Sequence, residues 1–264
     1  AAMTQPFNMN NGLTTGLIKE FAAFRMASSR FAAYLVIQAA VLVMAWPGES
    51  LFRLLYDERM PKTLFAYVVA LGITTAYFQL RAGAEELLGE RAATLSEWVV
   101  ATPLPIPLLL FNYCLGHLLQ SLWILFLCGP FLLIATIPSG VSAPVLFGLA
   151  LGVLVHGTFF RFVGACLYLL FGHLGRLHFV LLHIAAVAIW LGFTLTGEPL
   201  SYVELSRSLS GHWEGGQGSA GDSMAVTVGF VGGYASMAAG LIVCLFLLLT
   251  RRRRRYRMAS GQET

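Results

Sequence analysis

Six charged side chains lie close together in residues 81–105, directly between two long apolar stretches of the chain. They are Arg81, Glu85, Glu86, Glu90, Arg91 and Glu97, and the next Asp, Glu, Lys or Arg after them is Arg161. Carboxylates and guanidinium groups make charge-assisted hydrogen bonds, so a short helix that presents them can bind a complementary protein surface. The pattern favours a docking element, and the alternative is a solvated loop.

A second group of ionisable side chains, His156 and Arg161, lies inside an apolar stretch. An ionisable side chain inside a membrane span costs free energy, so such a residue is by default a candidate functional residue. The two residues are a little more than one helical turn apart and could face a water-filled cavity together. In the alternative interpretation, Arg161 extends to the cytoplasmic headgroups while His156 hydrogen-bonds a neighbouring helix.

Three histidines, His173, His178 and His183, recur every five residues, which could suggest a metal site. Steps of five residues advance about 500° around a helix, so successive imidazoles point about 140° apart and do not converge. The chain also lacks the HExxH and GxSxG patterns of zinc proteases and serine hydrolases. We therefore expect neither a metal site nor a cofactor in this chain.

The composition places these residues in a membrane. Hydrophobic residues make up 57% of the 264 and charged residues only 11%, which is far from the balance of soluble proteins. One crossing of the hydrocarbon layer takes roughly 20 helical residues. We predict an all-α polytopic membrane protein with a single transmembrane domain over residues 1–264. Apolar runs, free of formal charge except for Arg161, predict six spans, at about 31–47, 63–80, 106–136, 144–171, 177–197 and 224–250.

The distribution of Lys and Arg predicts the orientation of these spans. With the N-terminus inside, twelve of these residues outside the spans are cytoplasmic and four are exterior, as the positive-inside rule requires. Both termini and the segment 81–105 are then cytoplasmic, and residues 198–223 form an extracytoplasmic loop. The basic cytoplasmic tail, 251–264, carries Arg251–Arg255 and Arg257. We expect this tail to meet anionic membrane lipids rather than nucleic acid.

The residues before the first span form an amphipathic pattern. Leu17, Phe21 and Phe24 recur at helical spacing within 13–30, and basic residues lie elsewhere on the same helix. Helices of this kind lie along the headgroups with their apolar face in the membrane. We expect an interfacial helix over 13–30.

Two pairs of glycines have the GxxxG spacing, Gly148 with Gly152 and Gly229 with Gly233. Small residues let membrane helices approach closely. Packing within the chain and contact between two copies are both consistent with these pairs.

The order of these parts and one local motif resemble the permease subunit of ABC type-2 exporters. The motif is GERAATLSEWVVATPLP, ending directly before the third predicted span. Its matching positions are an acidic and basic pair, a threonine after a small residue, an amphipathic turn and Thr-Pro-Leu: Glu90, Arg91, Thr94, Leu95, Trp98, Thr102, Pro103 and Leu104. The layout covers nearly the whole chain. Ala93 stands where the family usually has glycine.

The resemblance implies a function as an exporter permease in the bacterial inner membrane. Two copies of the chain, or this chain with a homologous permease, would enclose the translocation path. A separate ABC ATPase subunit would bind ATP and Mg and drive transport, and an accessory extracytoplasmic protein is a further candidate partner. The segment between spans two and three would be the coupling helix, which docks on the ATPase through Glu85, Glu86, Glu90, Arg91 and Thr94.

The sequence also argues against ATP hydrolysis by this chain. A P-loop needs Gly-Lys followed by Ser or Thr, so that backbone amides and the lysine surround the phosphates. The only lysines are Lys19, after Ile18, and Lys62, after Pro61. We therefore expect that the chain is not an enzyme.

Two other classes of function are compatible with a charged segment between membrane spans. A membrane anchor or assembly factor would recruit a soluble partner through the same segment without transporting anything. An ion-coupled secondary transporter would carry carboxylates inside its spans, whereas every Asp and Glu here lies outside the predicted spans. The exporter permease is the leading hypothesis and the anchor is the alternative.

Overall fold

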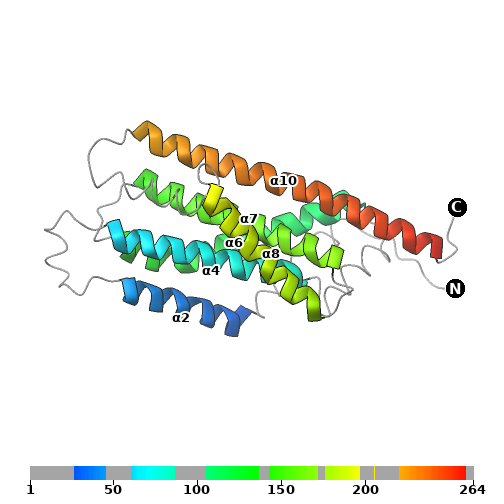
Figure 1. Cartoon of the computed structure of the whole chain (residues 1–264), viewed down its shortest axis with the longest axis horizontal. Coiled ribbons are helices and arrows are strands. Elements are labelled where there is room, and N and C mark those ends of the chain that lie inside the picture. Colours follow the sequence, from blue (N-terminus) through cyan, green and yellow to red (C-terminus); the bar gives the residue numbers. More distant parts are fainter. Residues whose placement is uncertain are drawn as a thin grey trace, which may run out of the picture.

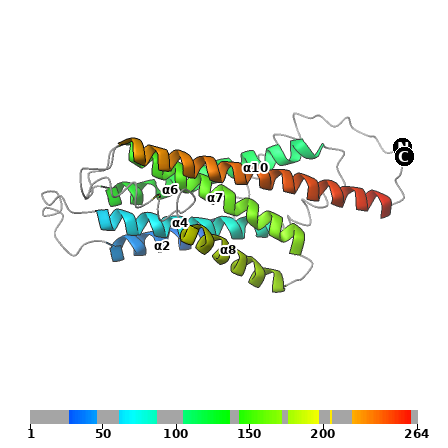
Figure 2. The same ribbon diagram turned by 45° about the horizontal axis from the view of Figure 1, so that its top comes forward.

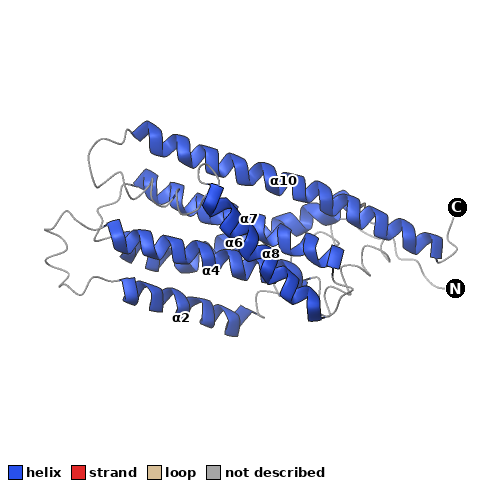
Figure 3. Cartoon of the chain, viewed as in Figure 1, coloured by secondary structure: helices blue, strands red, loops and turns tan. Residues whose placement is uncertain are grey.

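The computed structural model describes residues 27–45, 61–86, 105–136, 143–171, 176–196, 205 and 220–259. In these ranges the chain is almost entirely helical and contains no strand, as Figure 3 shows. The helices are α2 (Ala27–Ala45), α4 (Pro61–Glu86), α6 (Ile106–Thr136), α7 (Ala143–Phe171), α8 (Arg176–Thr196) and α10 (Ala220–Ala259). The all-helical prediction is confirmed for the described residues.

Three of the helices are long and apolar enough to cross a membrane. Their apolar parts are Ile106–Thr136 in α6, Leu146–Phe171 in α7 and Ala225–Tyr256 in α10. Shorter apolar stretches, Ala32–Met44 and Val180–Gly192, lie in α2 and α8. Membrane association is supported by these helices, and the number of six crossings stays a prediction.

The helices alternate in direction along one bundle. Figures 1 and 2 show α4, α7 and α10 running one way, while α2, α6 and α8 run the opposite way. The contacts agree, because α4 and α7 meet in parallel, with Gly157 near Thr75 and Gly83 near Arg161. Each described helix therefore begins at the end of the bundle where the described helix before it finishes.

The core of the bundle lies around α7. Within its apolar window 61% of the residues are buried, against 24% for α6 and 17% for α10. α7 packs against α4 most extensively and also contacts α10, α6 and α8. The large buried side chains of α7, Phe160 and Phe162 among them, pack against residues of α4, α6 and α10. Movement of α4 or α10 must therefore be accommodated by α7.

The helix bounds agree with the predicted spans to within a few residues, with two extensions. α4 continues past residue 80 to Glu86, and α10 continues past residue 250 through most of the basic tail to Ala259. Arg, Ala and Glu are strong helix formers, which explains why the charged residues extend α4 instead of ending it. Of the predicted interfacial helix 13–30, only 27–30 are described, and they belong to α2.

Candidate functional site

Polar side chains are concentrated in the interior of the bundle. Seven polar or charged residues are buried among the described ones: Gln38, Thr75, Gln79, His117, Ser121, His156 and Arg161. In a membrane protein each must find its partner inside the bundle, because hydrocarbon offers none. The contacts of these residues define the candidate site.

The central part of the site is the Arg161 cluster, which consists of Arg161, Gln79, Ser121 and His117. Nη1 of Arg161 donates a hydrogen bond to Oε1 of Gln79 at 3.2 Å. Nε2 of Gln79 donates to Oγ of Ser121 at 3.4 Å, and the His117 ring lies 3.5 Å from the same hydroxyl. One glutamine on α4 thus connects α7 to α6.

Aromatic rings enclose this cluster. The guanidinium carbon of Arg161 lies 5.9 Å from the centre of the Tyr113 ring, within the range of cation–π attraction. The His117 ring meets Phe162 edge-on at 5.7 Å between centroids. Tyr113 and His117 come from α6, so the rings add a second set of contacts between α6 and α7.

The guanidinium of Arg161 is completely buried. The structure therefore does not support the alternative in which this side chain extends to the headgroups. The physical reason is proximity, because the Gln79 carbonyl and the Tyr113 ring offer partners inside the bundle. A buried charge is held at considerable cost unless it is hydrogen-bonded in this way.

His156 lies in a different environment from Arg161. Its ring is completely buried and packs against Phe160 at 4.9 Å, Tyr234 at 5.2 Å and Phe230 at 6.2 Å between centroids. Phe230 and Tyr234 belong to α10, whereas the described contacts of Arg161 are with α4 and α6. Five residues correspond to about 140° around a helix, so the two side chains leave α7 in different directions. A shared polar site of His156 and Arg161 stays a prediction.

Two glycines lie in the seam between α4 and α7. A Cβ atom on Gly83 would overlap the carbonyl oxygen of Arg161 and lie 3.2 Å from the amide nitrogen of Ala165. A Cβ atom on Gly157 would lie 3.0 Å from Cγ2 of Thr75 and 3.3 Å from Cγ of Gln79. Small residues permit this kind of contact between membrane helices. The two helices therefore touch at their backbones, directly beside the Arg161 cluster.

Polar side chains also join α2 to α4. The hydroxyl groups of Tyr34 and Thr75 are 2.8 Å apart, and Nε2 of Gln38 donates to Oγ1 of Thr74 at 2.6 Å. Thr74 and Thr75, with Gln79 about one turn later, are polar interruptions of an apolar helix, and that spacing is the signal from which the site could have been found. These three residues, Ser121 and Tyr113 were not among the predicted site residues.

The predicted docking residues lie at the edge of the described structure. Glu85 and Glu86 are the last two residues of α4. Glu90, Arg91 and Thr94 are outside the described residues, so their docking role stays a prediction. In the structure, α4 is one continuous helix from Pro61 through the apolar residues to the two glutamates.

Gly152, from the first predicted glycine pair, packs within the chain. A Cβ atom there would lie 2.7 Å from Cδ2 of Leu205 and 3.8 Å from Cε1 of Phe230. Its partner Gly148 is also buried. Packing inside the chain is therefore the better interpretation of this pair.

The described residues contain no group of three His, Cys, Asp or Glu side chains placed to hold a metal ion. Of the three histidines at five-residue spacing, only the side chain of His183 is described, and its ring lies 5.6 Å from that of Tyr77. His173 is outside the described residues. What the described interior offers is hydrogen bonding and aromatic contact between helices.

Comparisons with protein-family models, with curated proteins and with solved structures give no match to this chain. The family resemblance in the sequence therefore stays a prediction. It depends on the layout of the chain and on the motif that ends before α6.

One contact between α7 and α10 offers a direct test of the bundle. The thiol of Cys166 contacts that of Cys244 and lies 3.7 Å from the carbonyl oxygen of Leu241. We expect copper phenanthroline to join the two cysteines in a disulfide, because their side chains pack in the same part of the core. Peptide mass spectrometry would detect the link. Cys128, in the other part of the core, is the matched control and should not join Cys244.

Proposed function

We propose that this chain is the permease subunit of an ATP-driven exporter of the ABC type-2 family. It would work as a dimer, with itself or a homologous permease, coupled to separate nucleotide-binding subunits. The observation that carries the proposal is the structure of α4, which is a single helix from its apolar part to the first charges of the segment 81–105. A helix of this kind is rigid enough to transmit a push from a cytoplasmic partner into the membrane.

The contacts of α4 support the transmission step. Gly83 lies against the backbone of Arg161, so a displacement of the charged end of α4 along the seam must move α7 as well. Gln79 hydrogen-bonds Arg161 on α7 and Ser121 on α6. Packed cores are bistable rather than continuously deformable. A push on α4 would therefore shift α4, α6 and α7 together between two arrangements.

Six crossings with both termini in the cytoplasm complete the proposal. Three helices are long and apolar enough by themselves, and the alternation of all six in Figure 1 is the order that six crossings require. The C-terminal ends of α4 and α10 and the N-terminal end of α8 point to the same end of the bundle. Arg81, Arg176 and Arg251–Arg255 lie at or near these helix ends, which agrees with a cytoplasmic face at that end.

The sequence indicates which subunit of the proposed complex would bind ATP. The ATPase subunit would bind ATP and Mg, because this chain has no P-loop lysine. Closure of two ATPase subunits would supply the bias between two arrangements of the permease that differ by only a few kcal/mol. The location would be the bacterial inner membrane, with an accessory extracytoplasmic protein as a further candidate partner.

The docking step is tested by reversing two charges, Glu90→Lys with Arg91→Glu. If these side chains pair with the ATPase, each reversal places like charges opposite one another, and the ATPase should be lost from the purified complex. Reversal of Arg53 and Arg59, in a loop predicted to be exterior, is the matched control. Co-purification and transport that survive the first pair of changes would rule out the docking assignment.

A second measurement separates the permease from a membrane anchor. A candidate cargo that raises the ATPase rate of the reconstituted complex supports transport. A rate that is the same with every cargo, in a complex that assembles normally, favours the anchor.

A further inference from the structure

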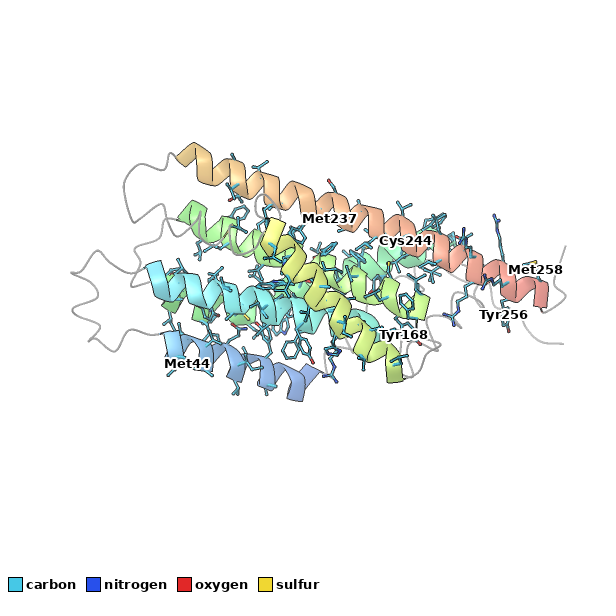
Figure 4. All side chains as sticks on the ribbon, viewed as in Figure 1. Met44, Tyr168, Met237, Cys244, Tyr256 and Met258 are labelled. Carbon is cyan, nitrogen blue, oxygen red and sulfur yellow. The ribbon has the colours of Figure 1, made fainter. Side chains whose placement is uncertain are left out.

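The far end of α10 carries an unusual concentration of positive charge. Arg251 to Arg255 are consecutive, and the helix continues through them to Ala259. Four of the five side chains are exposed and Arg253 is half-exposed. Figure 4 shows Tyr256 and Met258 just beyond these arginines, on the part of α10 that projects past the end of α7. We call the five residues the arginine collar.

The collar surrounds the whole helix. Successive residues advance about 100° around an α-helix, so five in a row cover more than a full turn. Leu245 and Leu249 are the last buried residues of α10, and from Thr250 to Met258 no described side chain is buried. All sides of the helix are therefore accessible at the collar. A protein groove would cover one side, whereas a lipid layer covers all of them.

The height of the collar matches a layer of headgroups. Five residues rise about 6 Å from the first Cα to the last. The polar region on each side of a bilayer is about 5–8 Å thick. The residues directly before the collar, 241–250, contain no charged side chain. The collar thus begins where the apolar part of α10 ends.

The collar brings like charges close together on one helix. Arginines three and four residues apart on a helix repel one another. No Asp or Glu occurs between Asp222 and Glu263, so α10 has no acidic residue within two turns of the collar. The guanidinium fork matches the oxygens of a phosphate group in a bidentate geometry. Phosphate oxyanions arranged around the helix would match both the charge and the geometry of the collar.

We propose that the arginine collar is a binding site for anionic phospholipids, which surround the end of α10 with their phosphate groups. The ligand class is a lipid phosphodiester with net negative charge, such as phosphatidylglycerol. Inorganic phosphate has the same chemistry but lacks the acyl chains that would place it beside α10. The site requires only that α10 crosses the membrane, so it does not depend on transport.

The proposal is tested on the full chain in nanodiscs of defined composition. Phenylglyoxal modifies arginine, and peptide mass spectrometry follows the modification of 251–255. We expect phosphatidylglycerol to slow this modification at least about fivefold relative to phosphatidylcholine. Inorganic phosphate added to phosphatidylcholine discs should have no effect. A free arginine derivative in the same sample corrects for any change in the reagent.

Variants then separate charge from geometry. Replacement of all five arginines by lysine keeps the charge but removes the fork, so phosphatidylglycerol retained in native mass spectra should fall about two- to threefold. Replacement by glutamine should remove the selectivity entirely. Tyr256→Phe with Met258→Leu is the matched control and should retain as much lipid as the unchanged protein.

Three results would overturn the lipid site. The first is equal modification of the collar in the two lipids. The second is protection by inorganic phosphate alone, which would indicate a site for free anions. The third is protection that appears only when an acidic partner protein is added, which would indicate a protein interface.

Discussion

Gly83→Ala is expected to destabilise the bundle more than any other single added methyl group for which a contact is known. The new Cβ would overlap the carbonyl oxygen of Arg161, and a backbone atom cannot move aside as a side chain does. Overpacking of this kind costs about 1–3 kcal/mol, which exceeds the gain of up to about 1 kcal/mol from the better helix propensity of alanine. The thermal unfolding temperature of the purified protein should therefore fall.

The chain offers matched controls for this experiment. Gly192, on α8, and Gly240, on α10, have no atom within 4 Å of an added Cβ. Gly192→Ala and Gly240→Ala gain helix propensity without a clash, so the unfolding temperature should stay the same or rise. If the unfolding temperature of Gly83→Ala also stayed the same or rose, α4 and α7 would not be in backbone contact at this position. The proposed mechanical link between the two helices would then have no basis.

The same variant bears on function. If α4 drives α7 through this seam, a displaced seam should weaken the coupling between ATP hydrolysis and transport even where the folded protein is recovered. Gly157→Ala is a milder case, because its Cβ would meet the side chains of Thr75 and Gln79 at 3.0 and 3.3 Å rather than a backbone atom. The two substitutions should rank in that order in both stability and coupling.

The helices could be predicted from the sequence because the relevant signals are local. Apolar runs, free of charge except for Arg161 and ended by charge, proline or glycine, gave the bounds of the six described helices to within a few residues, except at the C-terminal ends of α4 and α10. The extensions of α4 to Glu86 and of α10 to Ala259 were missed because a change of polarity was taken as the end of a helix. Helix propensity favours the continuation, since Arg, Ala and Glu are strong helix formers.

The interior of the site could be predicted only in part. Arg161 and His156 stand out in an apolar sequence, but what each one contacts depends on the rotation of α7 against α4, α6 and α10. No local pattern specifies that rotation. Gln79, the connecting residue, is uncharged and lies two residues before Arg81, so it is easily taken for part of the charged segment. The role of Gly83 could not be predicted from the sequence either, because it depends on contact with a backbone atom of a residue 78 positions away.

Gln79→Leu is expected to have the other large effect. Leucine has a similar volume but cannot accept the hydrogen bond from Nη1 of Arg161 or donate to Ser121. Removal of a hydrogen bond to a buried charged group costs about 1.5–3 kcal/mol. Ser121→Ala is the matched control, since it keeps the hydrogen bond to the Arg161 guanidinium and removes only the long contacts of its own hydroxyl with Gln79 and the His117 ring, worth about 0.5–1.5 kcal/mol each. Thermal unfolding of the purified variants measures the difference.

The double variant Gln79→Leu with Arg161→Met decides why the charge is present. When a charge and its partner are both replaced by apolar groups, the cost is often much smaller than the sum of the single changes. If the double variant is stable and still transports, the Arg161 cluster serves only to fix the packing of α4 on α7. If it is stable but does not transport, the buried guanidinium is needed for the movement itself. A double variant as unstable as the sum of its parts would show that Gln79 and Arg161 do not act together.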